Sequence, residues 1–216
     1  MSPAELVHRA RAAGLDRIAV TDHNEITGAL EARDLDPALV IVGEEVRCND
    51  GSELIGLFLE HRIRPGMSPE KTAERIHHQG GLVYLPHPYA YLTRATARAH
   101  RLLPLADIVE LFNGRAFWPR WNERARALVH EKRLHGAASS DAHLPSDCGR
   151  AWTEVDSASS AANLLAAMSN ATLVQGRTVS PLAHVATLSL GLTRLGRALL
   201  RRGVPTPAGD ADQAIT

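Results

Sequence analysis

Short apolar runs and helical patterns alternate along the first 140 residues of the chain. A helix is predicted from Ser2, a suitable N-cap ahead of a proline, to Gly14, which ends it. The predicted strands are 18–20, 39–42, 54–59, 82–85, 107–112 and 136–139, and the further predicted helices cover 29–33, 68–78 and 122–133. This alternation is typical of βαβ units and predicts an α/β fold built on a largely parallel sheet.

One connection departs from the βαβ pattern. The turn Asn49-Asp50-Gly51 lies between the apolar segments 46–48 and 54–59, and Asp-Gly is a strong hairpin signal, so an antiparallel pair is predicted there. No glycine-rich phosphate-binding loop of the GxGxxG or GxxxxGK[ST] type follows a strand. A dinucleotide site or a P-loop is therefore disfavoured.

The pattern changes near residue 180, so we expect one domain over residues 1–180. In residues 181–203 leucines recur on one helical face, which predicts an amphipathic helix. Packing of this helix on the domain is favoured over a membrane-surface or partner-binding role. Residues 204–216 are rich in Pro, Gly, Ala and Asp, and we expect a disordered tail.

Composition narrows the class of protein. The chain has 216 residues, 44% hydrophobic and 22% charged, which is typical of a globular domain. The 24 basic and 24 acidic residues cancel, so non-specific nucleic-acid binding is disfavoured. No signal sequence and no apolar run of about 20 residues is visible, and Cys48 and Cys148 form no CxxC motif. We expect a soluble, cytoplasmic protein without a membrane span.

Histidines are numerous, and some of them follow predicted strands. There are 11 histidines, against three each of Phe, Trp and Tyr. Polar residues recur at strand ends as Asp22-His23, Glu44-Glu45, His87, Asn113 and Asp141-His143. Carboxyl ends of parallel strands converge on one face, so these side chains are expected to meet. Imidazoles and carboxylates hold zinc, manganese or iron, and two or three such cations sharing a carboxylate activate water for attack on phosphorus.

Structural roles compete with the chemical ones. His23 could cap the following helix, and Glu44 with Glu45 could belong to a solvated loop. His87 is harder to explain structurally because prolines flank it on both sides. The eight histidines away from the strand ends are expected to be structural or surface residues.

Five segments together resemble the polymerase and histidinol phosphatase (PHP) superfamily, and the likeness covers about residues 2–180. The segments are Ala19–Asn24 (AVTDHN), Val42–Val46 (VGEEV), Val83–Pro88 (VYLPHP), Val109–Asn113 (VELFN) and Ser139–His143 (SSDAH). The resemblance implies a distorted (β/α)7 barrel with two or three divalent metal ions, manganese, iron or zinc. It implies hydrolysis of a phosphomonoester or nucleotide phosphodiester, so the expected partner is a small phosphorylated substrate or nucleotide.

The resemblance also implies roles for residues of this sequence. His23 and His143 would bind the third metal, Glu45 would bridge metals, His87 would bind the second metal and Asp141 the first. Three further residues are candidate catalytic groups. Asn113 lies near a ligand position of many members, Arg115 is a candidate contact for phosphate, and Asp22 precedes His23.

One feature of the family is missing from the sequence. Members begin with a strand that carries His-x-His, and no His-x-His occurs here, so we expect a barrel without its first strand and an unpaired edge at 17–21. The first metal would keep only Glu45 and Asp141, and fewer metals could be bound. The retained ligand residues favour a shortened form of an active enzyme over a degenerate, weakly active or inactive metal-binding domain.

A metal-dependent amidohydrolase on a similar barrel is a further alternative. It would call for a lysine at a strand end, whereas Lys71 and Lys132 both lie in predicted helices.

Overall fold

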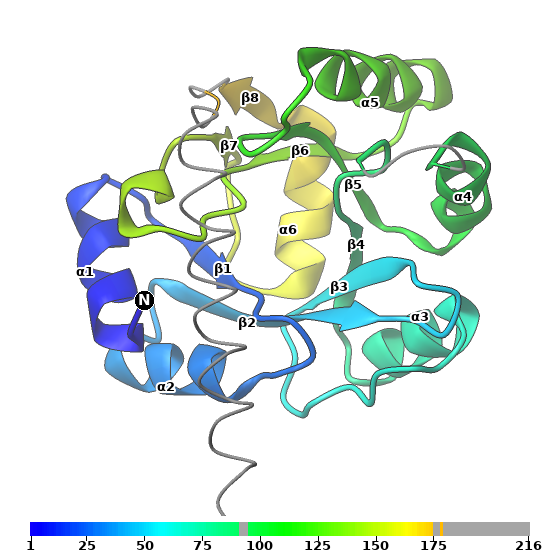
Figure 1. Cartoon of the computed structure of the whole chain (residues 1–216). Helices are drawn as coiled ribbons and strands as arrows, with labels where there is room; N and C mark the ends of the chain where they lie inside the picture. The colour runs from blue at the N-terminus through cyan, green and yellow to red at the C-terminus, as the bar shows by residue number, and fades with distance from the viewer. Residues whose placement is uncertain (91–94, 175–177, 179–216) are drawn as a thin grey trace, which may run out of the picture. The chain divides into compact units, whose positions relative to one another are not determined.

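The centre of the protein is a curled six-stranded sheet, seen in a computed structural model that describes residues 1–90, 95–174 and 178 (Figure 1). The strands lie in chain order: β1 (Ile18–Val20), β2 (Val40–Arg47), β3 (Glu53–Leu57), β4 (Leu82–Leu85), β5 (Ile108–Asn113) and β6 (Gly136–Ser139). The pairs β1–β2, β4–β5 and β5–β6 are parallel, whereas β3 runs antiparallel to both β2 and β4. The predicted α/β fold and the predicted hairpin are confirmed.

Helices surround the sheet, and a small second sheet follows it (Figure 1). The helices are α1 (Pro3–Ala12), α2 (Thr27–Leu35), α3 (Pro69–His78), α4 (Ala95–Leu102), α5 (Pro119–Lys132) and α6 (Ala161–Ala167), and β7 (Trp152–Glu154) pairs antiparallel with β8 (Thr172–Val174). The side chain of Ser2 caps α1 as predicted, and that of Ser68 caps α3 in the same way. The sequence pattern did not predict α4, α6, β7 or β8.

The two faces of the sheet are covered by different elements. On the convex face, apolar residues of α1, α2, α3 and α5 join the larger core cluster. On the concave face, α6 lies within the curve of the strands (Figure 1), where Leu164 and Met168 pack against side chains of the sheet such as Ile41 and Tyr84. Because α6 covers this part of the concave face, the rest of that face is left for polar side chains.

The hairpin changes the position that the sequence predicted for two carboxylates. β2 continues through Glu44 and Glu45 to Arg47, because β3 pairs with it along this length. Glu45 stands opposite Ile55, and Arg47 stands opposite Glu53. The prediction that the two glutamates follow the end of the strand is therefore wrong, since they lie inside it. Alternate side chains of β2 then point to opposite faces of the sheet.

β1 lies at one edge of the sheet, where β2 is its only partner strand among the described residues. Gly43 allows β1, β2 and β3 to approach closely. A Cβ atom at this position would lie 2.7 Å from the carbonyl oxygen of Gly56 and 2.9 Å from Cγ2 of Thr21. A larger residue at position 43 would therefore push β1 or β3 away from β2.

Residues Met1–Val179 form one compact unit. The helix predicted over 181–203 and the tail predicted over 204–216 lie outside the described residues. Among the helices that the structure describes, none combines the length and the apolar character that crossing a bilayer requires.

Candidate metal centre

A cleft of about 470 Å³ opens at the polar end of the concave face. All five predicted metal ligands line it, and they come from widely separated parts of the chain. Together with two further charged residues they are His23, Glu45, Arg47, Glu53, His87, Asp141 and His143. Strand order and curl therefore bring together groups that are up to 120 positions apart in the sequence.

Glu45 lies between two imidazoles. Its Oε1 atom is 3.2 Å from Nε2 of His87, and its Oε2 atom is 3.7 Å from Nδ1 of His23. Burial raises the pKa of the Glu45 carboxyl, but the hydrogen bond to His87 and the nearby imidazole charges outweigh burial and leave the pKa below its ordinary value. Glu45 is thus a buried carboxylate whose two oxygens face different nitrogen donors.

His87 has a constrained backbone and a strongly shifted pKa. Between Pro86 and Pro88 it adopts a positive φ of 28°, and its backbone N–H donates to Oε2 of Glu110 at 2.5 Å. Such strained residues persist only where their surroundings hold them, and they concentrate at functional sites. Burial lowers the pKa of His87, but the hydrogen bond with Glu45 and the surrounding carboxylates raise it to about 9.

Asp141 and His143 follow the end of β6 and line the same cleft as Glu45. Asp141 also has a positive φ, of 48°. Its Oδ1 atom lies 3.4 Å from Nδ1 of His143, and its Oδ2 atom accepts a hydrogen bond of 3.2 Å from the side chain of Asn113. The strand end therefore presents a carboxylate and an imidazole side by side.

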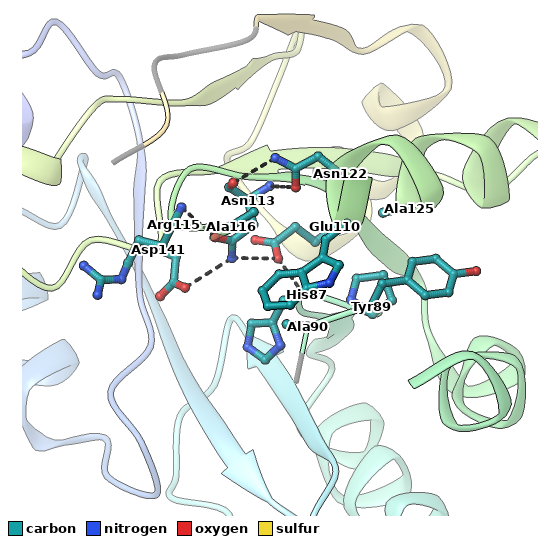
Figure 2. Close-up of a pocket in the computed structure, with 12 residues that line it drawn as sticks. His87, Tyr89, Ala90, Glu110, Asn113, Arg115, Ala116, Asn122, Ala125 and Asp141 are labelled. Atoms are coloured by element: carbon teal, nitrogen blue, oxygen red, sulfur yellow. Dashed lines mark hydrogen bonds between the residues drawn. The ribbon is translucent and has the colours of Figure 1, made fainter. Parts of the chain in front are cut away.

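A small pocket beneath these residues holds a network of buried hydrogen bonds (Figure 2). Its volume of about 30 Å³ admits water but not a substrate. The carboxylate of Glu110 lies there and accepts from four donors: the backbone N–H of His87 and the side chains of Tyr84, Asn113 and Ser139. Burial and the charge of Asp141 raise the pKa of Glu110. The hydrogen bonds from Ser139 and Asn113 lower it, but the pKa stays above its ordinary value. Glu110 thus anchors the backbone that carries His87.

Asn113 is buried and its hydrogen-bonding groups are occupied by the protein. Its Nδ2 atom donates to Glu110 at 3.0 Å and to Asp141 at 3.2 Å, while its Oδ1 atom accepts from the backbone N–H of Arg115 at 2.7 Å. Its backbone N–H and C=O pair with the side-chain amide of Asn122, as Figure 2 shows. The structure therefore places Asn113 behind Asp141 as a positioning residue.

Arg115, the predicted phosphate contact, is also turned inward. Its side chain is only 9% exposed, and Nη1 lies 3.2 Å from Oδ2 of the fully buried Asp147. The same oxygen accepts backbone N–H groups of His143 and Leu144. The pair of Arg115 and Asp147 thus fixes the loop that carries His143. Arg47, by contrast, lines the cleft, is exposed, and forms no ion pair within the described part of the chain.

Asp22 is not brought together with the other candidates. It is exposed, and its carboxylate lies beside the first turn of α2, where a Cβ atom on Gly28 would be 2.7 Å from Oδ2 of Asp22. It is absent from the described residues that line the cleft.

Three residues of the site were missed by the sequence analysis: Arg47, Glu53 and Glu110. A lone carboxylate inside the apolar run 108–112 was a signal for Glu110, and the Asp-Gly hairpin could have placed Glu53 opposite Arg47. Ligand atoms of His23, Glu45 and Glu53 all lie within 4.8 Å of one another.

The donor set of the cleft fits divalent metal ions. It offers three imidazoles and three carboxylates, from His23, His87, His143, Glu45, Glu53 and Asp141. Imidazole and carboxylate together suit zinc, iron and manganese. The central carboxylate of Glu45 is buried and its two oxygens face different imidazoles, an arrangement that fits a carboxylate shared by two metal ions.

Comparisons of sequence identify relatives without an established function. A family described as PHP-associated matches residues 119–173. An uncharacterised protein of Methanocaldococcus jannaschii is 40% identical over 115 residues, which cover 51% of this chain. A second uncharacterised protein from the same organism is 31% identical over 140 residues, which cover 62% of this chain. The chain spans 66% and 55% of the lengths of these two relatives.

Solved structures share the fold at low sequence identity. A two-domain protein from Bacteroides vulgatus, which contains a predicted PHP-like metal-dependent phosphoesterase, has a TM-score of 0.63 and 18% identity over 81% of this chain and 60% of its own. An amidohydrolase from Chromobacterium violaceum has a TM-score of 0.56 and 16% identity. The match covers 69% of this chain and 85% of the amidohydrolase. The lesion-specific endonuclease Q from Pyrococcus furiosus has a TM-score of 0.52 and 14% identity. The match covers 84% of this chain and 55% of the endonuclease.

These likenesses confirm the predicted fold, a curled and incomplete version of the distorted PHP barrel. Residues 119–173 thus match the PHP-associated family, and the described chain has the fold of a PHP-like protein.

Proposed function

We propose that this chain is a metal-dependent phosphoesterase that hydrolyses a phosphomonoester or a nucleotide phosphodiester in the cleft. The observation that carries the proposal is the position of Glu45, a buried carboxylate with one oxygen facing His87 and the other facing His23. Asp141 and His143 line the same cleft. Two or three divalent ions, manganese, iron or zinc, are the cofactors that this donor set suits.

The roles of the chain's own residues follow from their positions. Bound divalent ions would lower the pKa of a coordinated water and offset negative charge on the phosphoryl oxygens. Glu45, His87, Asp141, His23 and His143 would hold these ions. The hydrogen bonds of Glu110 and Asn113 would keep His87 and Asp141 in place. Their positions matter because a displacement of about 1 Å can lower the rate of an enzyme reaction by about 100-fold.

Arg47 is the residue that we assign to the phosphate group of the substrate. It is exposed on the wall of the cleft, and its guanidinium has no ion-pair partner in the part of the chain that the structure describes. A guanidinium matches phosphate oxygens in a bidentate arrangement. Arg115, which the sequence suggested for this role, is already paired with Asp147.

Two of the similar structures support phosphoester chemistry: one contains a predicted metal-dependent phosphoesterase, and the other is a lesion-specific endonuclease. An amidohydrolase shares it as well, and amide hydrolysis is the second candidate reaction. A carboxylated lysine is not available to such a reaction here, because Lys71 lies in α3 and Lys132 in α5, and neither lines the cleft.

The test is a metal-reconstituted activity assay. The purified chain is stripped with a chelator, reloaded with Mn²⁺, Zn²⁺ or Fe²⁺, and offered p-nitrophenyl phosphate, mononucleotides, bis-p-nitrophenyl phosphate, short oligonucleotides and amide substrates. We expect metal-dependent phosphoester turnover that Glu45→Gln abolishes. Turnover of amides alone would favour the amidohydrolase, and metal binding without any turnover would favour a non-catalytic metal-binding domain.

A further inference from the structure

Aromatic side chains are scarce in this chain, yet several of them lie together in one short segment. The chain has three Phe, three Trp and three Tyr, and Phe117, Trp118 and Trp121 are among them. The segment follows Asn113, the last residue of β5, and leads into α5, which begins at Pro119. It therefore leaves the sheet at the strand end where Asn113 contacts Asp141 of the candidate site.

Phe117 and Trp118, the aromatic pair, are both exposed. Their exposed fractions are 49% and 52%, whereas Phe112, Tyr84 and Tyr89 are buried. The ring centroids of the pair are 4.9 Å apart and the rings meet edge to face, at an angle of 82°. Single exposed apolar side chains are common, but two aromatic ones packed on each other form a small apolar surface, which is typical of a binding site. The contact also fixes how the two rings are oriented.

The aromatic pair lies at the edge of the candidate site. Ala116 and Trp121 stand on either side of it in the sequence, and both line the small pocket with His87 and Asp141 (Figure 2). His87 and Asp141 also line the cleft. Two residues of chain span at most about 7 Å, so the Cα atom of Trp118 lies within that distance of the Cα atom of Ala116. The backbone N–H of Trp121 donates to the carbonyl of Trp118 at 2.9 Å, which holds Trp118 against the first turn of α5.

Positive charge accompanies the aromatic pair. Arg120 is exposed in the first turn of α5, and no acidic residue lies in that turn. Arg124 follows one turn later and is also exposed, with its guanidinium 4.4 Å from the ring centroid of Tyr89. Exposed aromatic rings beside cationic side chains are typical of sites that bind nucleotides, because the base stacks on a ring and the phosphate is anionic.

The size of the aromatic pair favours a small planar ligand over a protein partner. An aromatic side chain has about 150–250 Å² of surface, so two half-exposed ones present about 200 Å². A stable protein interface needs about 800 Å² from each partner. The chain has no net charge, which disfavours binding of long nucleic acid through charge alone. Stacking of one base on one indole needs neither a large surface nor a high net charge.

We propose that the aromatic pair binds the base of a nucleotide substrate, with Trp118 stacking on the base while the phosphate lies in the cleft. The inference rests on the proposed function and deepens it, because it narrows the substrate from any phosphoester to one that carries a nucleobase. Stacking on an aromatic side chain strengthens binding by about 5- to 150-fold per base. Every base has an aromatic face, so Trp118 is expected to accept purines and pyrimidines alike.

The first test measures binding and requires no turnover. The chelator-treated chain is titrated with AMP, with a short single-stranded oligodeoxyadenylate and with ribose phosphate, while tryptophan fluorescence and heats of binding are recorded. We expect the two base-bearing ligands to bind and to quench the fluorescence, and ribose phosphate to bind at least tenfold more weakly. Whichever base-bearing ligand binds more tightly shows whether the base belongs to a free nucleotide or to the end of a strand.

Substitutions at Trp118 identify the stacking surface. Trp118→Ala should lose most of the quenching and bind AMP about tenfold more weakly, whereas Trp118→Phe keeps an aromatic face and should retain most of the affinity. In the metal-loaded chain, Trp118→Ala should raise KM for AMP about tenfold and leave KM for ribose phosphate within about twofold. Trp152→Ala is the matched control, because Trp152 is also exposed but lies in β7, outside the described lining of both cavities. Its affinity for AMP should be native, and far-ultraviolet circular dichroism checks that each variant is folded.

The outcomes separate this inference from the proposed function. Native affinity for AMP in Trp118→Ala, or equal or undetectable binding of AMP and ribose phosphate by the native chain, would overturn the role of the aromatic pair. Metal-dependent turnover of both compounds would then leave the proposed function standing. Base-dependent binding that Trp118→Ala loses, without phosphoester turnover by the metal-loaded native chain, would support the base site and overturn the proposed function. A changed oligomeric state of Trp118→Ala in analytical ultracentrifugation, with unchanged affinity for AMP, would instead assign the aromatic pair to a contact between two copies of the chain.

Discussion

Glu44 and Glu45 are consecutive residues of β2, and their carboxylates lie on opposite faces of the sheet. Glu45 meets His87 in the cleft, at 3.2 Å. Glu44 accepts a hydrogen bond of 2.7 Å from the backbone N–H of Ile63, and its other oxygen lies 4.0 Å from Nε of Arg62. One glutamate therefore belongs to the candidate site, while its neighbour fixes the segment that follows β3. Burial raises the pKa of Glu44.

This pair allows a test in which neighbouring positions serve as variant and control. Glu45→Gln removes a carboxylate that faces two imidazoles, so we expect the affinity for Mn²⁺ or Zn²⁺ to fall by at least tenfold. Glu44→Gln makes the same chemical change on the other face and should leave metal affinity within about twofold. Isothermal titration calorimetry of chelator-stripped protein measures both. Equal losses in the two variants would argue against a metal site centred on Glu45.

Asn113 offers a test of the network beneath the cleft. Asn113→Ala leaves the backbone N–H of Arg115 without its acceptor and removes a donor from Glu110 and from Asp141. We expect the free energy of unfolding to fall by about 1–3 kcal/mol, the cost of leaving a buried polar group unsatisfied. Urea denaturation in the presence of a chelator measures it. Asn163→Ala, on the exposed side of α6, should change stability by less than about 0.5 kcal/mol. A similar small change at Asn113 would contradict its positioning role.

Arg47 and Arg115 are expected to respond oppositely to truncation. Arg115→Ala removes the cation beside Oδ2 of the buried Asp147 and leaves only Arg150, 3.7 Å from Oδ1, so it should lower the free energy of unfolding by about 1–3 kcal/mol. Arg47→Ala removes an exposed side chain, so stability should stay within about 0.5 kcal/mol while KM for a phosphoester rises about tenfold or more.

Chemical denaturation and steady-state kinetics on the same preparations separate these effects. If the Arg47→Ala variant kept the native KM, Arg47 would have no role in binding the phosphate group. A fully stable Arg115→Ala variant with raised KM would return that role to Arg115.

His87 makes the metal-free protein sensitive to pH. Its pKa is about 9 in the folded chain, against about 6.5 for an unperturbed histidine. Because the folded value is raised, the stabilisation from protonated His87 is complete below about pH 6.5 and is lost as pH rises through about 9. Unfolding of the native chain and of His87→Gln in chelator should therefore differ more at pH 6.5 than at pH 9.5. A difference that grows with pH would contradict this pKa.

The affinity for metal should increase with pH, whereas the stabilisation from protonated His87 decreases with pH. A ligating imidazole must be neutral, so a metal ion that binds His87 displaces its proton at any pH below about 9. The affinity for Mn²⁺ is expected to increase with pH between 6.5 and 8.5, by up to about tenfold per unit. Titration calorimetry in buffers of different ionisation enthalpy counts the released proton. Binding that releases no proton at pH 7 would exclude His87 from the ligand set.

Several features of the fold could be predicted because local chemistry determines them. Ser2 and Ser68 cap helices through their own side chains, and the apolar runs 18–20 and 136–139 became strands with the predicted limits. The short elements β7, α6 and β8 were missed, because Ala-rich and three-residue segments carry weak periodicity and are stabilised by tertiary packing.

The sequence by itself determined which residue types stand near the strand ends, and five predicted ligand residues do line one cleft. The tertiary structure decided which of them face it. Side chains alternate along a strand, so the pairing of β2 with β3 separates Glu44 from Glu45 and adds Glu53. The tertiary structure also decided which arginine is available to bind phosphate. Arg115 is paired with Asp147, which lies 32 residues further along the chain. The interaction between two charges depends on their distance in the folded protein, and a local sequence pattern does not give that distance.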